Sequence, residues 1–481
     1  MTVSSTLVSL ILGIPIAYFY SFYKIKGAKV IFVLSVLCSM SAPFIGAYSW
    51  ILLMGRNGLV AKLFKLVGMT APTIYGRGGI IFVFTLHLFP YIYLYTSGAM
   101  NSIDASLEEA AENLGMSKLK RIWTVTLPVV LPSILAGCVM VFMTCLADFG
   151  PPMLLGEGYT VLPVLVYNEY MSESAVNPYM ASALSVIIVS CSLLVLMFQK
   201  LVIDKRNYQM SSLRPPKETE LRGFKRFLVS LPIWIVVFLA FLPQIVVICQ
   251  SFVERSFSGV VKGINFNNYR FISGRLATNI KNTYLFSLIA IVFIILVGIL
   301  VSYILVRKKG KVAHLIDTLI MFPYVIPGSV LGIGLIIAFN RKPVVLVGTA
   351  AIMIISYVIR KLPYTVRSGT AFLYQMDPFV EEASINLGVS PLKTFFTVTA
   401  RMMLPGVMSG AVISWITCIN ELSSSIMLYS GKTSTIAVAI YQEVVRMSDG
   451  PASALATILT LSSMISLIIV FRMTKGKVKI V

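Results

Sequence analysis

The chain has few charged residues, few histidines and scattered cysteines. Only 12% of its 481 residues are Asp, Glu, Lys or Arg, two are histidine, and none of the six cysteines forms a C-x-x-C pair. A soluble globular domain carries about 25% charged residues, so an ordinary soluble protein is excluded. The cysteines and histidines are too scattered for a zinc site or a disulfide framework. We therefore assign no metal ligands.

Motifs of nucleotide-hydrolysing and hydrolytic enzymes are also missing from the sequence. Gly431-Lys432-Thr433 resembles the end of a P-loop, but Ile426 stands where the motif requires glycine. Neither H-E-x-x-H nor a nucleophile elbow is present. We expect a chain that is not an enzyme, with no catalytic residue and no cofactor of its own.

What the chain does have is apolar sequence flanked by basic residues. Hydrophobic residues make up 57% of the chain, and the formal net charge is +21. The basic residues gather just outside the apolar runs, which is the positive-inside pattern of a bacterial membrane protein. Binding to nucleic acid would need a basic face on a recognisable fold. We expect a multi-pass protein of the bacterial inner membrane, in contact with lipid and with no nucleic acid.

The apolar runs predict an all-α polytopic fold. A helix needs roughly 20 apolar residues to cross the hydrocarbon core. Eleven runs meet this requirement, at about 2–23, 28–54, 79–100, 131–150, 180–200, 227–251, 283–306, 314–339, 344–366, 404–424 and 453–472.

The chain divides into two halves of the same orientation. We expect a first half over 1–203 with five spans, a basic cytoplasmic linker over 204–224, and a second half over 225–481 with six spans. The motif Lys24-Ile25-Lys26-Gly27 resembles Arg307-Lys308-Lys309-Gly310, so the first half lacks a counterpart of the helix at 227–251. Either the start lies inside a longer reading frame or that first helix has been lost.

A polar segment recurs between apolar helices. Residues 104–132 and 377–405 are identical at 15 of 29 positions, at a constant offset of 273. The shared residues include two adjacent acids and a glycine (Glu108, Glu109 and Gly115; Glu381, Glu382 and Gly388). Charged sequence kept in both halves of a membrane protein is hard to explain by core packing. It indicates a docking surface used twice, with a partner present twice.

Each copy predicts a helix, a glycine turn and a second short helix. In the first copy, Glu108, Glu109 and Glu112 lie near the start of a helix, where acids are favoured. Asn113-Leu114-Gly115 is typical of a helix stop, because glycine readily takes the left-handed conformation. Such a cytoplasmic elbow can insert into a cleft of a partner.

These residues resemble the E-A-A-x3-G-x9-I-x-L-P signature of permease subunits of binding-protein-dependent ABC importers. The first copy matches at Glu109-Ala110-Ala111, Gly115, Val125 (in place of Ile) and Leu127-Pro128. The second matches at Glu382-Ala383, Gly388 and Val398, and departs from the signature at Ser384 and Ala400-Arg401. The fused layout is similar to iron(III)-type permeases.

The resemblance implies two parallel-repeat halves of a type I importer, with elbows that contact ATPase subunits. We name the elbows the first coupling loop (104–127) and the second coupling loop (377–400). The resemblance implies contact through Glu108, Glu109, Ala110 and Gly115, and through Glu381, Glu382, Ala383 and Gly388. It further implies two copies of a cytoplasmic ATPase subunit that hydrolyses ATP, and an external binding protein. The implied substrate is ferric iron, with a phosphonate, sugar phosphate or polyamine as alternatives.

Ionisable residues at membrane depth are the candidates for the substrate pathway. Asp148 and Glu421 hold equivalent places and suit a cationic substrate, or they cap helices or meet external water. His87 and Arg360 are likewise equivalent, and with Lys361 they suit an anion or a metal carried with an anion. Alternatively, these bases reach lipid head groups or pair with an internal acid such as Asp317. The two sets favour opposite substrate charges, and the sequence does not decide between them.

Two other classes of protein remain as alternatives. An ion-coupled secondary transporter would need a relay of acids or histidines deep in its spans, and this chain has few. A membrane scaffold without transport would leave the duplicated elbow unexplained.

Overall fold

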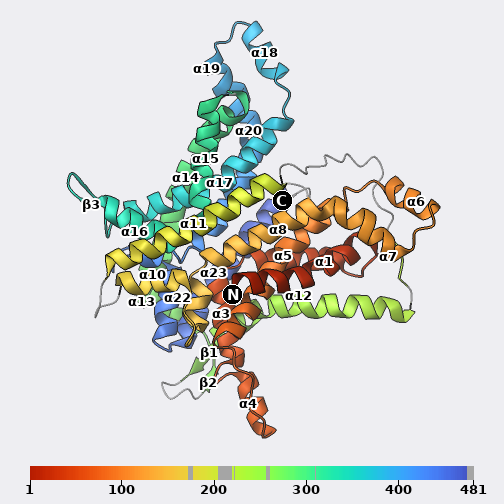
Figure 1. Cartoon of the computed structure of the whole chain (residues 1–481). Coiled ribbons are helices and arrows are strands. Elements are labelled where there is room, and N and C mark those ends of the chain that lie inside the picture. The colour runs from red at the N-terminus through yellow and green to blue at the C-terminus, as the bar shows by residue number, and fades with distance from the viewer. Residues whose placement is uncertain (172–176, 204–218, 222, 256–260, 309, 474–481) are drawn as a thin grey trace. The chain divides into compact units, whose positions relative to one another are not determined.

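The computed structural model describes residues 1–171, 177–203, 219–221, 223–255, 261–308 and 310–473, and it is built almost entirely of helices (Figure 1). Among these residues, eight helices are long and apolar enough to cross a membrane, or up to ten if each of two bent pairs is one span. The remaining predicted span corresponds to α17 (Ala350–Gln375), which carries Arg360, Lys361 and Arg367. The predicted all-α polytopic fold is confirmed.

Contacts divide the chain into two compact units, the first over Met1–Val247 and the second beginning at Ile248. Each unit is described by itself. The first contains α1 (Thr2–Phe22), α2 (Ala28–Met40), α3 (Pro43–Met54), α4 (Leu59–Leu66), α5 (Arg77–Met100), α6 (Ala105–Asn113), α7 (Lys118–Arg121), the π-helix η1 (Ile122–Thr126), α8 (Leu127–Ala147), α9 (Gly150–Leu155), α10 (Leu162–Met171), α11 (Pro178–Ile203) and most of α12 (Gly223–Ser251).

The second unit is also helical, with two small antiparallel sheets, β1–β2 and β3–β4. Its elements are β1 (Val253–Arg255), β2 (Val261–Ile264), α13 (Asn267–Arg275), α14 (Ala277–Arg307), α15 (Lys311–Val325), α16 (Gly328–Phe339), β3 (Asn340–Arg341), β4 (Val344–Val345), α17, α18 (Phe379–Asn386), α19 (Pro391–Thr394), the π-helix η3 (Phe395–Thr399), α20 (Ala400–Ile419), α21 (Ser425–Leu428), α22 (Ile436–Val445) and α23 (Asp449–Met473).

Helix α12, which the sequence groups with the second half, has most of its length in the first unit. The Cys38 thiol donates to the carbonyl of Ala240 at 3.2 Å, and the Ser49 hydroxyl donates to the carbonyl of Pro243 at 2.9 Å. Most of the predicted linker, residues 204–218 and 222, lies outside the described residues. The division into 1–203, 204–224 and 225–481 stays a prediction.

Two predicted spans, 28–54 and 314–339, are bent pairs of helices rather than single helices. Helices α2 and α3 meet at 100°, and α15 and α16 at 108°. Both breaks precede a proline, Pro43 or Pro327. Proline lacks an N–H and disfavours helical backbone in the residue before it. Accordingly, Ala42 and Ile326 are extended, with ψ of 124° and 127°.

Three helices form the scaffold that leads to each coupling loop. Helices α5 and α8 pack together with α1 in the first unit, as α17 and α20 do with α14 in the second. Glycines bring the second set close together, since a Cβ on Gly410 would lie 2.7 Å from the Cα of Thr365. Such close approach of backbones is typical of membrane helices. In both units the chain leaves this scaffold to form the coupling loop.

Candidate functional site

The two coupling loops have the same local geometry. Helices α6 and α18 each end at a glycine with a left-handed backbone, Gly115 at φ +74° and Gly388 at φ +85°. The next N–H in each copy closes the turn, from Met116 to the carbonyl of Ala111 at 3.1 Å and from Val389 to that of Ser384 at 3.2 Å. The predicted glycine turn is therefore present in both halves, followed in each by a short helix and a π-helix.

An aspartate begins each coupling helix. The Asp104 carboxylate accepts the N–H of Ser106 at 2.9 Å, and the Asp377 carboxylate accepts that of Phe379 at 3.0 Å. A carboxylate at this place satisfies an amide that has no partner within the helix. The sequence therefore fixes both ends of each coupling helix, by the aspartate at its start and the glycine at its end.

The paired glutamates in each copy have different surroundings. Glu109 and Glu382 are exposed, as are the neighbouring alanines and the glycines (Ala110, Ala383, Gly115 and Gly388). Glu108 and Glu381 are partly buried: Glu108 accepts from the Thr126 hydroxyl of η1, and Glu381 accepts from Arg307 of α14. The coupling helices stand at the ends of the long helices of each unit (Figure 1). Each coupling helix thus has one glutamate exposed to solvent, and its other glutamate contacts residues of the same unit.

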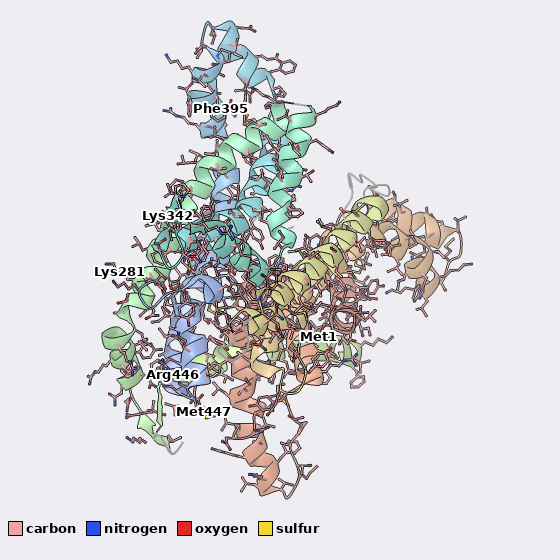
Figure 2. The ribbon with its side chains drawn as sticks, turned by 60° about the vertical axis from the view of Figure 1, so that its left-hand side comes forward. Met1, Lys281, Lys342, Phe395, Arg446 and Met447 are labelled. Carbon is pink, nitrogen blue, oxygen red and sulfur yellow. The ribbon has the colours of Figure 1, made fainter. Side chains whose placement is uncertain are left out.

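The attachment of the loops to their units was not predicted. In the second unit, the ring of Phe395, at the start of η3, lies 4.8 Å from that of Tyr303 on α14. Figure 2 shows Phe395 at the protruding end of this unit. In the first unit, the Lys118 amine contacts the Tyr23 hydroxyl and lies 4.6 Å from the centre of its ring. These pairs are distant in sequence, and no local pattern indicates them.

A cavity of about 310 Å³ lies between the first coupling helix and the end of α1. Its lining combines acids and bases with aromatic rings: Tyr18, Phe22, Glu108, Glu109, Glu112, Lys118 and Arg121. Arg121 is paired with Glu112 at 2.6 Å. The first coupling loop therefore leaves space beneath it that side chains do not fill.

Substitution of Gly388 tests the glycine turn. No atom lies within 4 Å of a Cβ built at this position, so the cost of a side chain comes from backbone conformation alone. That cost is about 1–2 kcal/mol for most residues and is lower for asparagine. We expect Gly388→Val to reduce co-purification of the ATPase that the resemblance implies, while Gly388→Asn retains most of it. Equal retention by both variants would show that the turn does not control docking.

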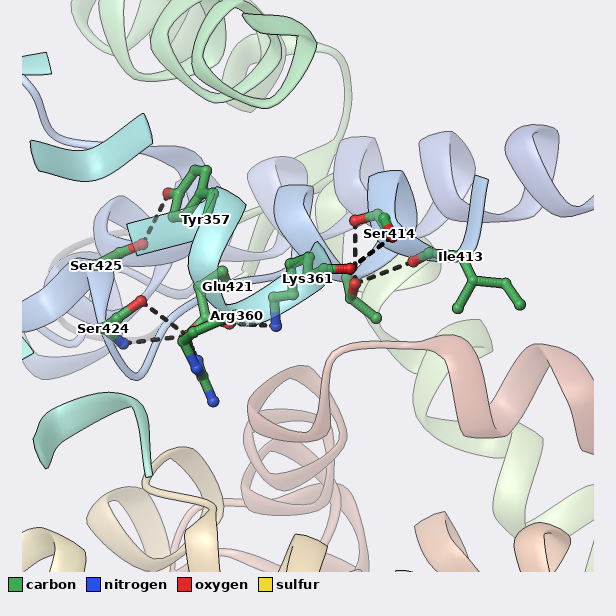
Figure 3. Close-up of polar contacts among 9 residues, drawn as sticks. Tyr357, Arg360, Lys361, Ile413, Ser414, Glu421, Ser424 and Ser425 are labelled. Atoms are coloured by element: carbon green, nitrogen blue, oxygen red, sulfur yellow. Dashed lines mark hydrogen bonds and ion pairs between the residues drawn. The ribbon is translucent and has the colours of Figure 1, made fainter. Parts of the chain in front are cut away.

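A second polar site lies within the helices of the second unit. Arg360 and Lys361 on α17 both pair with Glu421, which follows α20 (Figure 3). The Lys361 amine lies 2.6 Å from Glu421 Oε2, and the Arg360 guanidinium contacts Oε1. Their side chains are 14%, 10% and 5% exposed. This ionic cluster holds two cations and one anion, so one positive charge is in excess.

Neighbouring hydroxyl groups fix the ionic cluster in place. Ser424 donates its N–H and its hydroxyl to Glu421 Oε1 at 3.1 and 3.2 Å. The Ser414 hydroxyl donates to the carbonyl of Lys361 at 2.8 Å, and the Tyr357 and Ser425 hydroxyls lie 2.8 Å apart (Figure 3). A buried charge pair persists where such bonds satisfy its remaining polar atoms.

The equivalent positions of the first unit carry different side chains. Asp148 accepts the N–H of Gly150 at 3.0 Å and so caps α9. His87 is 8% exposed on α5, and Leu88 stands where the second unit has Lys361. Arg360 and Lys361 do pair with an internal acid, but that acid is Glu421 and not the suggested Asp317, which pairs with Arg367 at 3.1 Å. The acid and the bases that favoured opposite substrates pair with each other within the second unit, with one positive charge in excess.

Comparison with known proteins decides the family. The sequence matches the family described as "Binding-protein-dependent transport system inner membrane component" over residues 3–208 and again over 294–478. The chain belongs to this family. It is a permease subunit of the inner membrane, built of two copies of one unit, and it works with a substrate-binding protein.

Curated relatives are similar over most of their length. The ferric transport system permease protein FbpB of Actinobacillus pleuropneumoniae is 29% identical, over 98% of this chain and 70% of that protein. The putative ferric transport system permease protein FbpB 1 of Haemophilus influenzae is 27% identical, over 89% and 68%. The molybdate/tungstate permease WtpB of Pyrococcus furiosus is 30% identical, over 34% of this chain and 65% of that protein.

Proposed function

We propose that this permease moves its substrate inward with energy from two copies of a separate cytoplasmic ATPase subunit. The observation that carries the proposal is the duplicated coupling helix, which exposes Glu109 in one half and Glu382 in the other. Two equivalent exposed surfaces fit two equivalent partners. The chain itself supplies no catalytic residue and binds no cofactor, and the partner subunits hydrolyse ATP.

The coupling loops transmit work as rigid bodies. A loaded binding protein docks on the outer face, and the ATPase subunits hold the first and second coupling loops on the inner face. Closure of the ATPase subunits on ATP moves the halves from an inward-open to an outward-open state, and hydrolysis resets them. Each partner shifts this equilibrium only by the difference in its affinity for the two states.

The substrate that the relatives support is ferric iron, since two of them are ferric permeases aligned over most of this chain. The buried ionic cluster of Arg360, Lys361 and Glu421 is a second argument about the substrate, because it carries one positive charge in excess. Such a site repels a bare trivalent cation and attracts an anion. It favours iron that travels with an anionic ligand, and molybdate is the second candidate because of the WtpB relative.

Reconstituted vesicles test the function. The chain is co-expressed with its ATPase and binding protein, and uptake is measured with ferric chloride, ferric citrate and molybdate as separate probes. We expect ATP-dependent uptake of the ferric probes and stimulation of ATP hydrolysis by the loaded binding protein. Uptake driven by an ion gradient without the ATPase would instead show a secondary transporter. Uptake of molybdate alone would overturn the assignment of iron.

A further inference from the structure

A single guanidinium joins three elements at the base of the second coupling loop. Arg307 is the last residue of α14, and its Nε donates to Glu381 Oε1 of α18 at 3.1 Å. Its Nη2 donates to the carbonyl of Met376, just after α17, at 3.3 Å. The two charged side chains are 16% and 12% exposed, so water screens this pair less than a surface ion pair.

An aromatic contact one helical turn away acts on the same loop. Tyr303 precedes Arg307 by four residues, so both side chains lie on one face of α14. The Tyr303 ring meets that of Phe395 edge to face, at 4.8 Å and 61°. We name Tyr303 and Arg307 the α14 clamp. It fixes the coupling helix at one end of the loop and η3 at the other.

The α14 clamp stands on a packed core. Val306 lies between its two residues in sequence and belongs to a buried cluster formed with α17 and α20: Leu373, Met376, Met403 and Val407. Leu373, Met403 and Val407 are fully buried. Packed interiors transmit displacement rather than absorb it. A shift of α14 against α17 would therefore be carried directly into α18.

The first unit uses different residues at the corresponding places. Lys24 stands at the position of Arg307 in the repeat and pairs with Glu220 at 3.0 Å, with side chains 63% and 59% exposed. Tyr20 stands at the position of Tyr303 and packs against Tyr93 at 5.3 Å between ring centres. The cavity of about 310 Å³ lies beneath this coupling helix. Exposed ion pairs contribute little, and this one joins Lys24 to the segment before α12. The first coupling loop is held through Lys118 and Tyr23, above the unfilled cavity. This attachment is therefore the weaker one.

We propose that Arg307 is a positioning residue that fixes the second coupling helix rigidly to α14 and α17, so that the two coupling loops transmit unequally. The inference rests on the proposed function, because it assumes that an ATPase holds both loops. Arg307 acts through Glu381 and Met376 and does not itself touch ATP or substrate. Glu382, the neighbouring exposed acid, remains available to the partner.

Charge exchange tests the positioning role. The full complex is reconstituted with binding protein and ferric citrate, and the ratio of stimulated to basal ATP hydrolysis is measured. We expect Arg307→Ala and Glu381→Ala each to lower this ratio about tenfold, as expected when one partner of a partly buried pair is removed. The double exchange Arg307→Glu with Glu381→Arg should recover much of the ratio, and Arg307→Lys should retain part of it because lysine keeps the charge but not the fork of donors.

Controls separate this role from folding and from docking. Lys24→Ala is the matched change in the first unit and should alter the ratio by less than about twofold. If Arg307→Ala does not accumulate in the membrane, Arg307→Lys and the double exchange provide the test. A wild-type ratio in Arg307→Ala, or a loss of equal size in Lys24→Ala, would overturn the proposal. Failure of the wild-type chain to bind any ATPase would instead overturn the proposed function.

Discussion

Glu109→Lys combined with Glu382→Lys is expected to abolish association with the ATPase while the chain still inserts and folds. Both side chains are exposed on coupling helices that stand away from the packed helices. Reversal of an exposed charge changes folding stability by about 0.5 kcal/mol or less. Like charges facing each other across an interface cost several kcal/mol. Loss of binding without loss of protein is therefore the predicted result.

Co-purification from detergent-solubilised membranes measures this effect. The chain carries an affinity tag, and the amount of ATPase recovered with it is compared between variants of equal membrane level. Glu157→Lys is the matched control, because it makes the same charge change at an exposed site between α9 and α10, on the predicted outer side. Unchanged recovery of the ATPase with the double variant would contradict the assignment of the coupling loops as the docking surface.

The single variants refine the result. A rigid element loses less entropy on binding, so a more rigid second coupling loop would contribute more to the affinity for the ATPase. In that case Glu382→Lys should lower the amount of co-purified ATPase more than Glu109→Lys does. The signature residues also differ between copies, with Ser384 in place of alanine in the second. In the structure, the Ser384 hydroxyl bonds that of Thr394 at 3.0 Å, which ties α18 to α19. The departure from the signature thus adds an internal bond to the second loop.

Local features of the coupling loops followed from the sequence. Asp104, Gly115 and their counterparts set helix ends by interactions within a few residues, and such interactions depend on the local sequence alone. The long apolar spans were predictable for the same reason, because the requirement for about 20 apolar residues is local. The breaks before Pro43 and Pro327 could not be predicted from the local sequence alone, because proline in a span either kinks the helix or ends it.

Contacts between distant residues were not predictable. Arg307 and Glu381 are 74 positions apart, and Arg360 and Glu421 are 61 apart. The sequence placed Arg360, Lys361 and Glu421 among the pathway candidates but could not show that they pair with one another. The π-helices η1 and η3 were not predicted from the sequence, although they occupy equivalent places in the repeat. Single π-helical turns often mark functional sites, and here both lie where a coupling loop joins its next span.

Glu421→Gln is expected to prevent accumulation of folded protein. The change removes the one anion of the ionic cluster and leaves Arg360 and Lys361 side by side, buried and without a counter-charge. Breaking a buried ion pair by removing one partner costs about 3–5 kcal/mol, which is a large fraction of the total stability of a domain. The amount of monodisperse protein after solubilisation, and its unfolding temperature, measure the loss.

Lys361→Leu is the informative contrast, because it reduces the cluster from a net charge of +1 to a neutral pair of Arg360 and Glu421. The first unit already carries leucine at the equivalent position, Leu88. The Ser424 bonds to Glu421 would remain, so we expect near wild-type amounts of folded protein. If the excess positive charge serves the passage of an anionic iron complex, this folded variant should lose uptake of ferric citrate about tenfold or more, as loss of one charge-assisted contact predicts. Stable Glu421→Gln protein would show that the cluster is not held together by charge balance, and full uptake by Lys361→Leu would remove Lys361 from the pathway.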